Sequence, residues 1–185
     1  PGEGLQGVNL HPFAGTAHIA CGESPVGGWE QSAITLGAVV NTAGKDFQNV
    51  NGIVFDKNVI CLHPGDGGTL VVLRWTAPRS GTVKTSTIFT AIDNPVTDVH
   101  VLHAHNGVVR SLFSGEINRA ANTTRLDASQ AAVAVSAGDY IDVAVGWGSD
   151  RSNGKDSTGV FHAVTYLSGL GVQQSGETGS QKVMQ

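Results

Sequence analysis

Hydrophobic and polar residues alternate with a period of two along most of this chain, and the stretch 81–92 shows the pattern most clearly. Successive side chains of a β-strand point to opposite faces, so this alternation predicts a strand. Because the second face also carries an isoleucine, we expect both faces to be at least partly covered. One face holds Val83, Thr85, Thr87 and Phe89, and the other holds Lys84, Ser86, Ile88 and Thr90.

Similar patterns predict strands over most of the remaining chain. Asn106-Gly107 stands between two apolar alternating runs, and this dipeptide favours the tight turn of a β-hairpin. The other runs rich in β-branched and aromatic residues end at glycine or proline. The predicted strands are 16–21, 33–40, 53–62, 68–77, 98–103, 108–113, 140–145 and 160–167.

The stretch 128–137 has two readings. Asp127 and Gln130 resemble a capping box, and Gly138 would suit the end of a short helix. Val133 and Val135 alternate with small residues, however, and the alternation continues after Gly138, which favours a strand.

Short strands at regular spacing with Gly-rich turns predict an all-β fold, a jelly-roll-like antiparallel β-sandwich. We assign the sandwich to residues 58–167 and an N-terminal extension of loops and strands to residues 1–57. Residues 168–185 form a polar, Gly/Ser-rich C-terminal tail. A tail of this composition is expected to be disordered unless a sheet edge or a neighbouring subunit holds it.

Composition narrows the function classes. Charged residues make up 14% of the chain and hydrophobic residues 40%, and 15 acidic side chains outnumber 11 basic ones, which suits an extracellular β-protein. Without a Lys/Arg cluster, binding to nucleic acid is not expected. No apolar stretch approaches the roughly 20 residues of a membrane helix. The chain begins at Pro1 without a signal peptide, so we interpret it as the mature form of a secreted or cell-surface protein.

Cys21 and Cys61 are the two cysteines, and they lack the spacing of a zinc site or a redox pair. In an exported protein a Cys21–Cys61 disulfide is the simplest interpretation; two buried free thiols are the alternative. The triplet Asn122-Thr123-Thr124 permits N-glycosylation.

The segment from about Leu62 to Leu167 resembles a family of jelly-roll modules of secreted bacterial proteins, common in planctomycetes. The resemblance implies a fold and not a ligand: such modules accompany polysaccharide-active enzymes or sit in exported and surface proteins, and are often compared with carbohydrate-binding modules. Residues 1–57 and the tail lie outside it. The matching pieces are Leu62-His63-Pro64-Gly65, 72–78, Ser80-Gly81-Thr82-Val83, 97–103, Asn106-Gly107, Leu112-Phe113, 138–146 and Asp156-Ser157-Thr158-Gly159.

Aromatic residues are the candidates for binding sugars, because an indole face matches the apolar face of a pyranose. Trp147 stands at a strand end beside a polar loop and is the best candidate, followed by Tyr140 and Trp29. In the alternative readings, Trp29 covers the core or anchors an interface. Trp75 lies within a strand and is expected in the core.

Two groups of residues suggest metals. His100, His103 and His105 could bind a transition metal, but an extended strand points His100 away from the other two. Asp150, Asn153 and Asp156 offer oxygen ligands for Ca²⁺ in the polar loop before the last strand. In the alternative reading, Asp156 accepts hydrogen bonds from backbone amides of an Asx-turn loop.

The sequence shows no nucleophile elbow, zinc-protease motif, phosphate loop or acid pair at catalytic spacing, so an enzyme is the least favoured class. The favoured hypothesis is a non-catalytic extracellular assembly protein, such as a filament or surface-layer subunit. A sandwich with an open groove can accept a strand from a neighbour. The segment containing Leu5, Val8, Leu10 and Phe13 is the candidate donor. A carbohydrate-binding module is the alternative.

Overall fold

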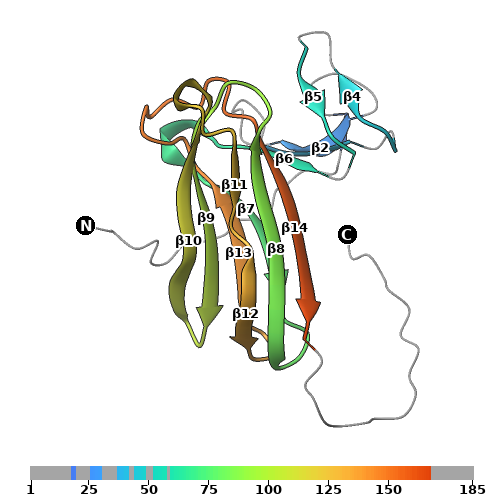
Figure 1. Cartoon of the computed structure of the whole chain (residues 1–185), viewed down its shortest axis with the longest axis vertical. Helices are drawn as coiled ribbons and strands as arrows, with labels where there is room; N and C mark the ends of the chain where they lie inside the picture. The colour runs from blue at the N-terminus through green and yellow to red at the C-terminus, as the bar shows by residue number, and fades with distance from the viewer. Residues whose placement is uncertain are drawn as a thin grey trace.

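The computed structural model consists of two antiparallel sheets packed against each other (Figure 1). It describes residues 37–41, 44–48, 52–57 and 59–167 and, for the backbone alone, residues 18–19 and 26–30. Within these residues, the helical pieces are two short 3-10 turns, η2 (Asp66–Gly68) and η3 (Arg119–Ala121). The prediction of an all-β sandwich is therefore confirmed.

The larger sheet has eight strands in the order β1-β2-β3-β6-β14-β8-β11, with β12 also paired to β8. Their bounds are β1 (His18–Ile19), β2 (Val26–Glu30), β3 (Gly37–Asn41), β6 (Ile60–His63), β8 (Gly81–Ala91), β11 (Arg125–Asp127), β12 (Gln130–Val135) and β14 (Thr158–Tyr166).

The second sheet has four strands in the order β10-β9-β13-β7. They are β7 (Val71–Thr76), β9 (Val96–His105), β10 (Val108–Asn118) and β13 (Tyr140–Val145). A separate two-stranded sheet pairs β4 (Phe47–Gln48) with β5 (Val54–Phe55).

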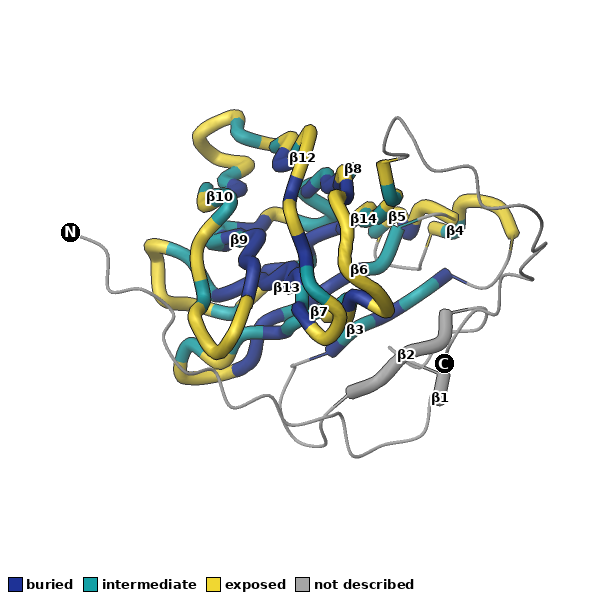
Figure 2. Tube along the Cα trace, turned by 90° about the horizontal axis from the view of Figure 1, so that it is seen from below, coloured by how far each residue is buried: buried dark blue, intermediate teal, exposed yellow. Residues whose placement is uncertain are grey.

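The core lies between the two large sheets, where buried residues concentrate (Figure 2). The structure shows which face of β8 points into the core: Val83, Thr85, Thr87 and Phe89 are at most 1% exposed. On the other face Ser86, Ile88 and Thr90 are partly buried, as expected from the sequence. The second sheet contributes Val99 and Val101 of β9 and Ile141, Val143 and Val145 of β13, all 0% exposed. Phe89 packs in a stacked arrangement on Phe113, with ring centroids 6.4 Å apart.

The β9–β10 hairpin turns at Asn106 and Gly107, as predicted from the sequence. Both residues have positive φ, 49° and 77°, which is the requirement of the tight turn that Asn-Gly favours. Further along the hairpin the pairing register shifts between Ser111 and Phe113, so that Leu112 is an extra residue in β10.

The structure confirms some of the other strand predictions and contradicts one of them. The stretch 128–137 contains strand β12 and no helix, which confirms the favoured reading. The single strand predicted at 53–62 is wrong, because a turn with Val59 N donating to Asp56 O separates β5 from β6. Strands β2, β4 and β11 were not predicted. β3 pairs with β6, so residues 37–41 belong to the larger sheet, and the boundary after residue 57 stays a prediction.

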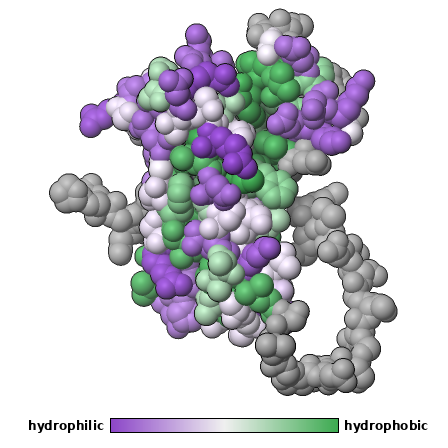
Figure 3. Space-filling model, in the orientation of Figure 1, coloured by the Kyte–Doolittle hydropathy of each residue, from purple (hydrophilic) through white to green (hydrophobic). Residues whose placement is uncertain are grey.

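A smaller apolar cluster lies beside the main core. Val39, Phe55 and Cys61 are its buried members, and Phe47, Ile53 and Ile92 pack against them. Figure 3 shows hydrophobic residues gathered in this upper right part of the molecule, near β4 and β5. No helix among the described residues is long and apolar enough to cross a membrane.

Candidate functional site

One side of the sandwich, between β14 and β7, is incomplete in the described part of the chain. β14 pairs with β8 over its whole length, from Thr158 to Tyr166, but with β6 only at Thr158, Gly159 and Val160. Residues 161–166 therefore have no described strand on their second edge, and β13 is the one described partner of β7. We call these two facing edges the open side (Figure 1).

The inward side chains at the open side are less buried than those of the rest of the core. Leu73 and Trp75 of β7 and Val164 and Tyr166 of β14 are only partly buried, whereas Val83 and Ile141 are 0% exposed. The rings of Trp75 and Tyr166 lie 6.2 Å apart and connect the two sheets. The open side thus has an apolar floor that a further strand would cover.

The outward face of β14 also carries exposed apolar side chains. Phe161 is 38% and Leu167 42% exposed, and they stand at opposite ends of the unpaired stretch. The other large apolar residues with high exposure among the described residues are Val54 (43%) of β5 and Val108 (67%). Val108 lies at the tip of the β9–β10 hairpin and away from this edge.

His162 introduces one polar group into the inward face of β14. Its Nδ1 lies 2.9 Å from Thr87 Oγ1, while its Nε2 is buried without a hydrogen-bond partner. Burial lowers the pKa of this imidazole to about 4, so the ring is neutral at physiological pH. A neutral imidazole with one unsatisfied nitrogen can accept or donate a further hydrogen bond.

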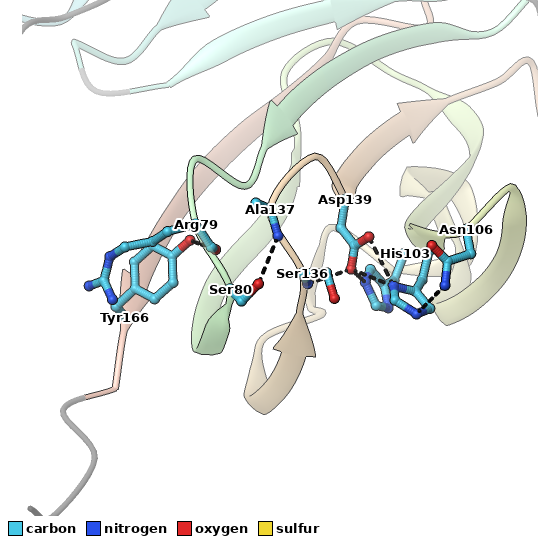
Figure 4. A network of polar contacts seen from close by, with 9 residues as sticks. Arg79, Ser80, His103, Asn106, Ser136, Ala137, Asp139 and Tyr166 are labelled. Atoms are coloured by element: carbon cyan, nitrogen blue, oxygen red, sulfur yellow. Dashed lines mark hydrogen bonds and ion pairs between the residues drawn. The ribbon is translucent and has the colours of Figure 1, made fainter.

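The lower end of the open side is fixed by contacts of Tyr166. Its hydroxyl donates to Arg79 O at 2.5 Å, and the Arg79 guanidinium lies 4.0 Å from the ring centroid (Figure 4). These contacts hold β14 against the turn between β7 and β8.

At the upper end of the sandwich, Asp98 organises the loop that carries Trp147. Gly148 N donates to Asp98 Oδ1 at 2.7 Å, and His100 Nε2 lies 2.7 Å from Asp98 Oδ2. Burial would raise the pKa of Asp98, but the hydrogen bonds from His100 and Gly148 outweigh it, so this pKa lies below its ordinary value. Gly148 has φ +65° and would place a Cβ 2.2 Å from Val96 O, so glycine is required there.

The candidate sugar-binding aromatic residues already have neighbours. Trp147 is partly buried, and a Cβ on Gly68 would lie 3.1 Å from its ring, so the backbone at Gly68 packs on the indole. Arg74 lies 3.7 Å from the centroid of the Tyr140 ring and forms two 2.7 Å hydrogen bonds with Asp142. The side chain of Trp29 is outside the described residues. A role for these three in sugar binding stays a prediction.

A polar line of side chains, which was not predicted from the sequence, crosses the outer face of the four-stranded sheet. His100 connects Asp98 on its own strand with Ser114 of β10, because His100 Nδ1 lies 3.1 Å from Ser114 Oγ. Ser111 Oγ continues the line, 3.0 Å from Ser114 Oγ. Acyl transfer at Ser114 would also need hydrogen-bond donors aimed at the oxyanion that forms in the reaction. Among the described residues, the side chains that contact Ser114 Oγ are those of His100 and Ser111.

The three residues predicted for calcium have different surroundings. Asp150 Oδ1 accepts from Ser152 N, whereas Asn153 Nδ2 donates to Asp66 Oδ1 at 2.6 Å. Asp156 is 1% exposed; Val96 N donates to its Oδ1, and its Oδ2 has no partner. Burial, together with the charges of Asp150, Asp98 and Asp93, raises the pKa of Asp156 to about 7 against the opposing Val96 hydrogen bond.

Two of the three histidines meet at one carboxylate at the lower end (Figure 4). His105 Nδ1 lies 2.9 Å and His103 Nε2 3.3 Å from Asp139 Oδ2, which also accepts from Ser136 N. The Ser136 hydrogen bond, and next those from the histidines, hold the pKa of Asp139 below its ordinary value against the effect of burial. His100 lies on the other face, as predicted. Among the described residues, no three His, Cys, Asp or Glu side chains are arranged to hold a metal ion.

The remaining predicted residues are placed in part. Asn122 is exposed at the end of η3, with φ 63°, and its glycosylation stays a prediction. Cys61 is buried, but Cys21 lies outside the described residues, so the disulfide also stays a prediction. The same holds for the donor segment with Leu5, Val8, Leu10 and Phe13.

The missed sites share one cause: their parts are far apart in the sequence. Gly148 and Asp98 are separated by 50 positions. The unpaired edge of β14 depends on how far β6, a distant segment, extends along it. Comparison with known proteins adds no name to these observations, since no family model and no curated protein match the chain.

Proposed function

We propose that this protein is a non-catalytic, extracellular assembly subunit whose open side accepts a β-strand from a second copy of the chain. The observation that carries the proposal is the unpaired edge of β14 at residues 161–166, beside inward side chains that are only partly buried.

An unpaired strand edge favours pairing with another chain. Its free N–H and C=O groups bond to any strand laid against them, and natural proteins normally protect such edges with charge, proline or a covering segment. The outward positions of β14 here are Phe161, Ala163, Thr165 and Leu167, with no charged residue among them. Within the described part of the chain, this edge therefore has no charged residue, proline or paired strand at residues 161–166 to protect it.

The proposed donor is the segment containing Leu5, Val8, Leu10 and Phe13. On an extended strand Val8 and Leu10 share one face, which would enter the space between the sheets above Trp75 and Val164. Donor and acceptor are different surfaces, so the contact between copies is head-to-tail and extends into a fibre instead of closing.

Charge placed on the open edge is expected to abolish assembly. In the double variant Phe161→Lys/Leu167→Lys, the lysines stand outward on β14, where they leave the core intact but repel a pairing strand. We expect polymers of the unmodified chain, seen by electron microscopy and light scattering, to be replaced by monomers. Val108→Lys makes the same change at an exposed site away from the edge and should assemble normally.

Deletion of residues 1–15 tests the donor separately and should give monomers that still accept a donor peptide. Polymers that persist in both the lysine variant and the deletion would refute the proposal. So would an unmodified chain that remains monomeric at all concentrations.

Carbohydrate binding is the second candidate function. The supporting observation is the fixed polar face of the four-stranded sheet, with Asp98, His100 and Ser114 in one hydrogen-bonded line next to the Trp147 loop. Hydroxyl-rich ligands bind to such fixed donors and acceptors beside an aromatic ring.

Trp147→Ala is expected to abolish retardation in polysaccharide affinity gels, whereas Trp147→Phe, which keeps an aromatic face, should retain part of it. Circular dichroism shows whether each variant is folded. No retardation of the unmodified chain by any polysaccharide would count against this function.

A further inference from the structure

We propose that His162 determines which strand the open side accepts. The strand is an extended polypeptide with a neutral side chain that both donates and accepts hydrogen bonds opposite His162, and with apolar side chains opposite Val164 and Tyr166. This inference deepens the proposed function, on which it rests for the source of the strand, because it names the chemistry that the open side recognises.

The contact of His162 with the neighbouring strand sets the direction of its ring. His162 stands directly opposite Thr87 of β8, and its Nδ1 lies 2.9 Å from Thr87 Oγ1. The two nitrogens of an imidazole form hydrogen bonds in nearly opposite directions, so a ring bonded to β8 through Nδ1 directs Nε2 away from β8. On that side of β14, β6 pairs only with residues 158–160. Nε2 is therefore directed toward the unpaired edge.

The same nitrogen defines what a partner must provide. Nε2 is buried without a hydrogen-bond partner, and burial keeps the ring neutral, with a pKa of about 4. Nε2 of a neutral imidazole is a donor in one tautomer and an acceptor in the other, and an amide or hydroxyl side chain can pair with either. A charged side chain would lose its hydration there without a counter-charge, and an apolar one would leave Nε2 unsatisfied.

The next two inward positions of β14 require apolar partners. Val164 and Tyr166 are partly buried parts of the core, and Leu73 and Trp75 of β7 are partly buried in the same way. The rings of Trp75 and Tyr166 are 6.2 Å apart. Because side chains of a strand alternate between its faces, every second residue of an incoming strand enters this space.

The position of β6 indicates the direction and length of the strand. β6 pairs antiparallel with β14, and its first residue, Ile60, stands opposite Val160. A strand that runs antiparallel along residues 161–166 continues the line of β6 and ends next to Ile60. From its N-terminus, this strand has apolar residues facing Tyr166 and Val164 and a neutral polar residue facing His162.

The pattern also fixes the register. A slip of one residue turns all three inward side chains outward. A slip of two residues places an apolar side chain opposite His162 or a polar one opposite Val164. The open side therefore discriminates between strands that have the same composition and a different order.

Two hexapeptides, Val-Thr-Val-Thr-Gln-Thr and Val-Thr-Val-Thr-Val-Thr, test the inference because they differ only at the residue that faces His162. Fluorescence anisotropy of the labelled peptides measures their binding to the full chain, at concentrations at which the chain does not scatter light. We expect the Gln peptide to bind at least about tenfold more tightly. His162→Leu should abolish or reverse this preference, whereas Ala163→Ser, on the outward face of the same strand, should retain it.

A second measurement uses the unmodified protein, since His162→Leu also removes the partner of Thr87. In nitrogen NMR of the imidazole rings, the Gln peptide should shift the Nε2 signal of His162 and leave its Nδ1 signal nearly unchanged. The Val peptide should shift neither signal. The signals of His162 are assigned by their loss in His162→Leu.

The outcomes separate this inference from the proposed function. Equal affinities for the two peptides, a preference that persists in His162→Leu, or an unshifted Nε2 signal would overturn the role of His162 and leave assembly through the edge standing. Binding of neither peptide by a chain that assembles would have the same meaning. A chain that discriminates between the peptides but never assembles would overturn the proposed function and support the role of His162.

Discussion

Replacing Asp156 by asparagine is expected to raise the free energy of unfolding at pH 7, by at most about 4 kcal/mol, and to leave it nearly unchanged at pH 3. The carboxyl group has a pKa of about 7 in the fold against 3.8 in a model compound, and each pKa unit corresponds to about 1.4 kcal/mol. Asparagine keeps an oxygen to accept from Val96 N but cannot ionise.

The sign follows from proton linkage. The pKa of Asp156 is higher in the folded than in the unfolded state, so its stabilising effect is complete below pH 3.8 and is lost as the pH rises to about 7. His162 acts in the opposite direction, because its pKa falls from 6.5 to about 4 on folding and stability is lost as the pH falls through that range. The difference between variant and unmodified protein cancels the histidine, and urea denaturation across this range measures it.

Asp139 provides the matched control at the other end of the sandwich. Its pKa lies below the ordinary value, so Asp139→Asn should destabilise the fold at pH 7 and approach neutrality in acid. If the two asparagine variants changed stability in the same direction, the assigned environment of Asp156 would be wrong.

The same measurement bears on the calcium prediction. If Asp156 helps to hold the ion, added Ca²⁺ should stabilise the unmodified protein and leave Asp156→Asn unaffected.

Phe89→Ala is expected to lower the free energy of unfolding by about 3–5 kcal/mol, the usual cost of removing a buried phenylalanine ring. Phe89 is 0% exposed between the sheets and packs on Phe113. Phe161→Ala, which removes the same ring from the outward face of the adjacent strand, should change stability by less than about 1 kcal/mol.

Denaturant unfolding of both variants provides the comparison. If both variants lowered the free energy of unfolding equally, Phe89 of β8 would not point inward while Phe161 of β14 points outward. The register of the larger sheet would then need revision.

The sequence predicted the strands that carry their own pattern. Alternation in β8 indicated its position and which side chains share a face, and Asn106-Gly107 located the hairpin. β2 has two glycines in Val26–Glu30 and β11 has three residues, so neither shows a pattern of its own. Both are strands because of their partners, β3 and β8, which a local pattern cannot reveal.

The candidate sites divide in the same way. Asp156 was a candidate because it lies in a polar loop. The raised pKa of Asp156, however, depends on burial and on the charges of Asp98 and Asp93, which belong to other parts of the chain. The separation of His100 from His103 followed directly from strand geometry. The open side could not be predicted, because it depends on β6 beginning only at Ile60, opposite Val160, while β14 continues to Tyr166.

The extra residue in β10 has a consequence for how copies can meet. A bulge twists an edge strand and interrupts the even spacing of its free amides, so β10, despite running from Val108 to Asn118, is a poor template for a second chain. Arg110, exposed on the same strand, adds a charge against such pairing. If the protein assembles as proposed, contacts between copies along β10 would therefore be disfavoured relative to contacts through β14.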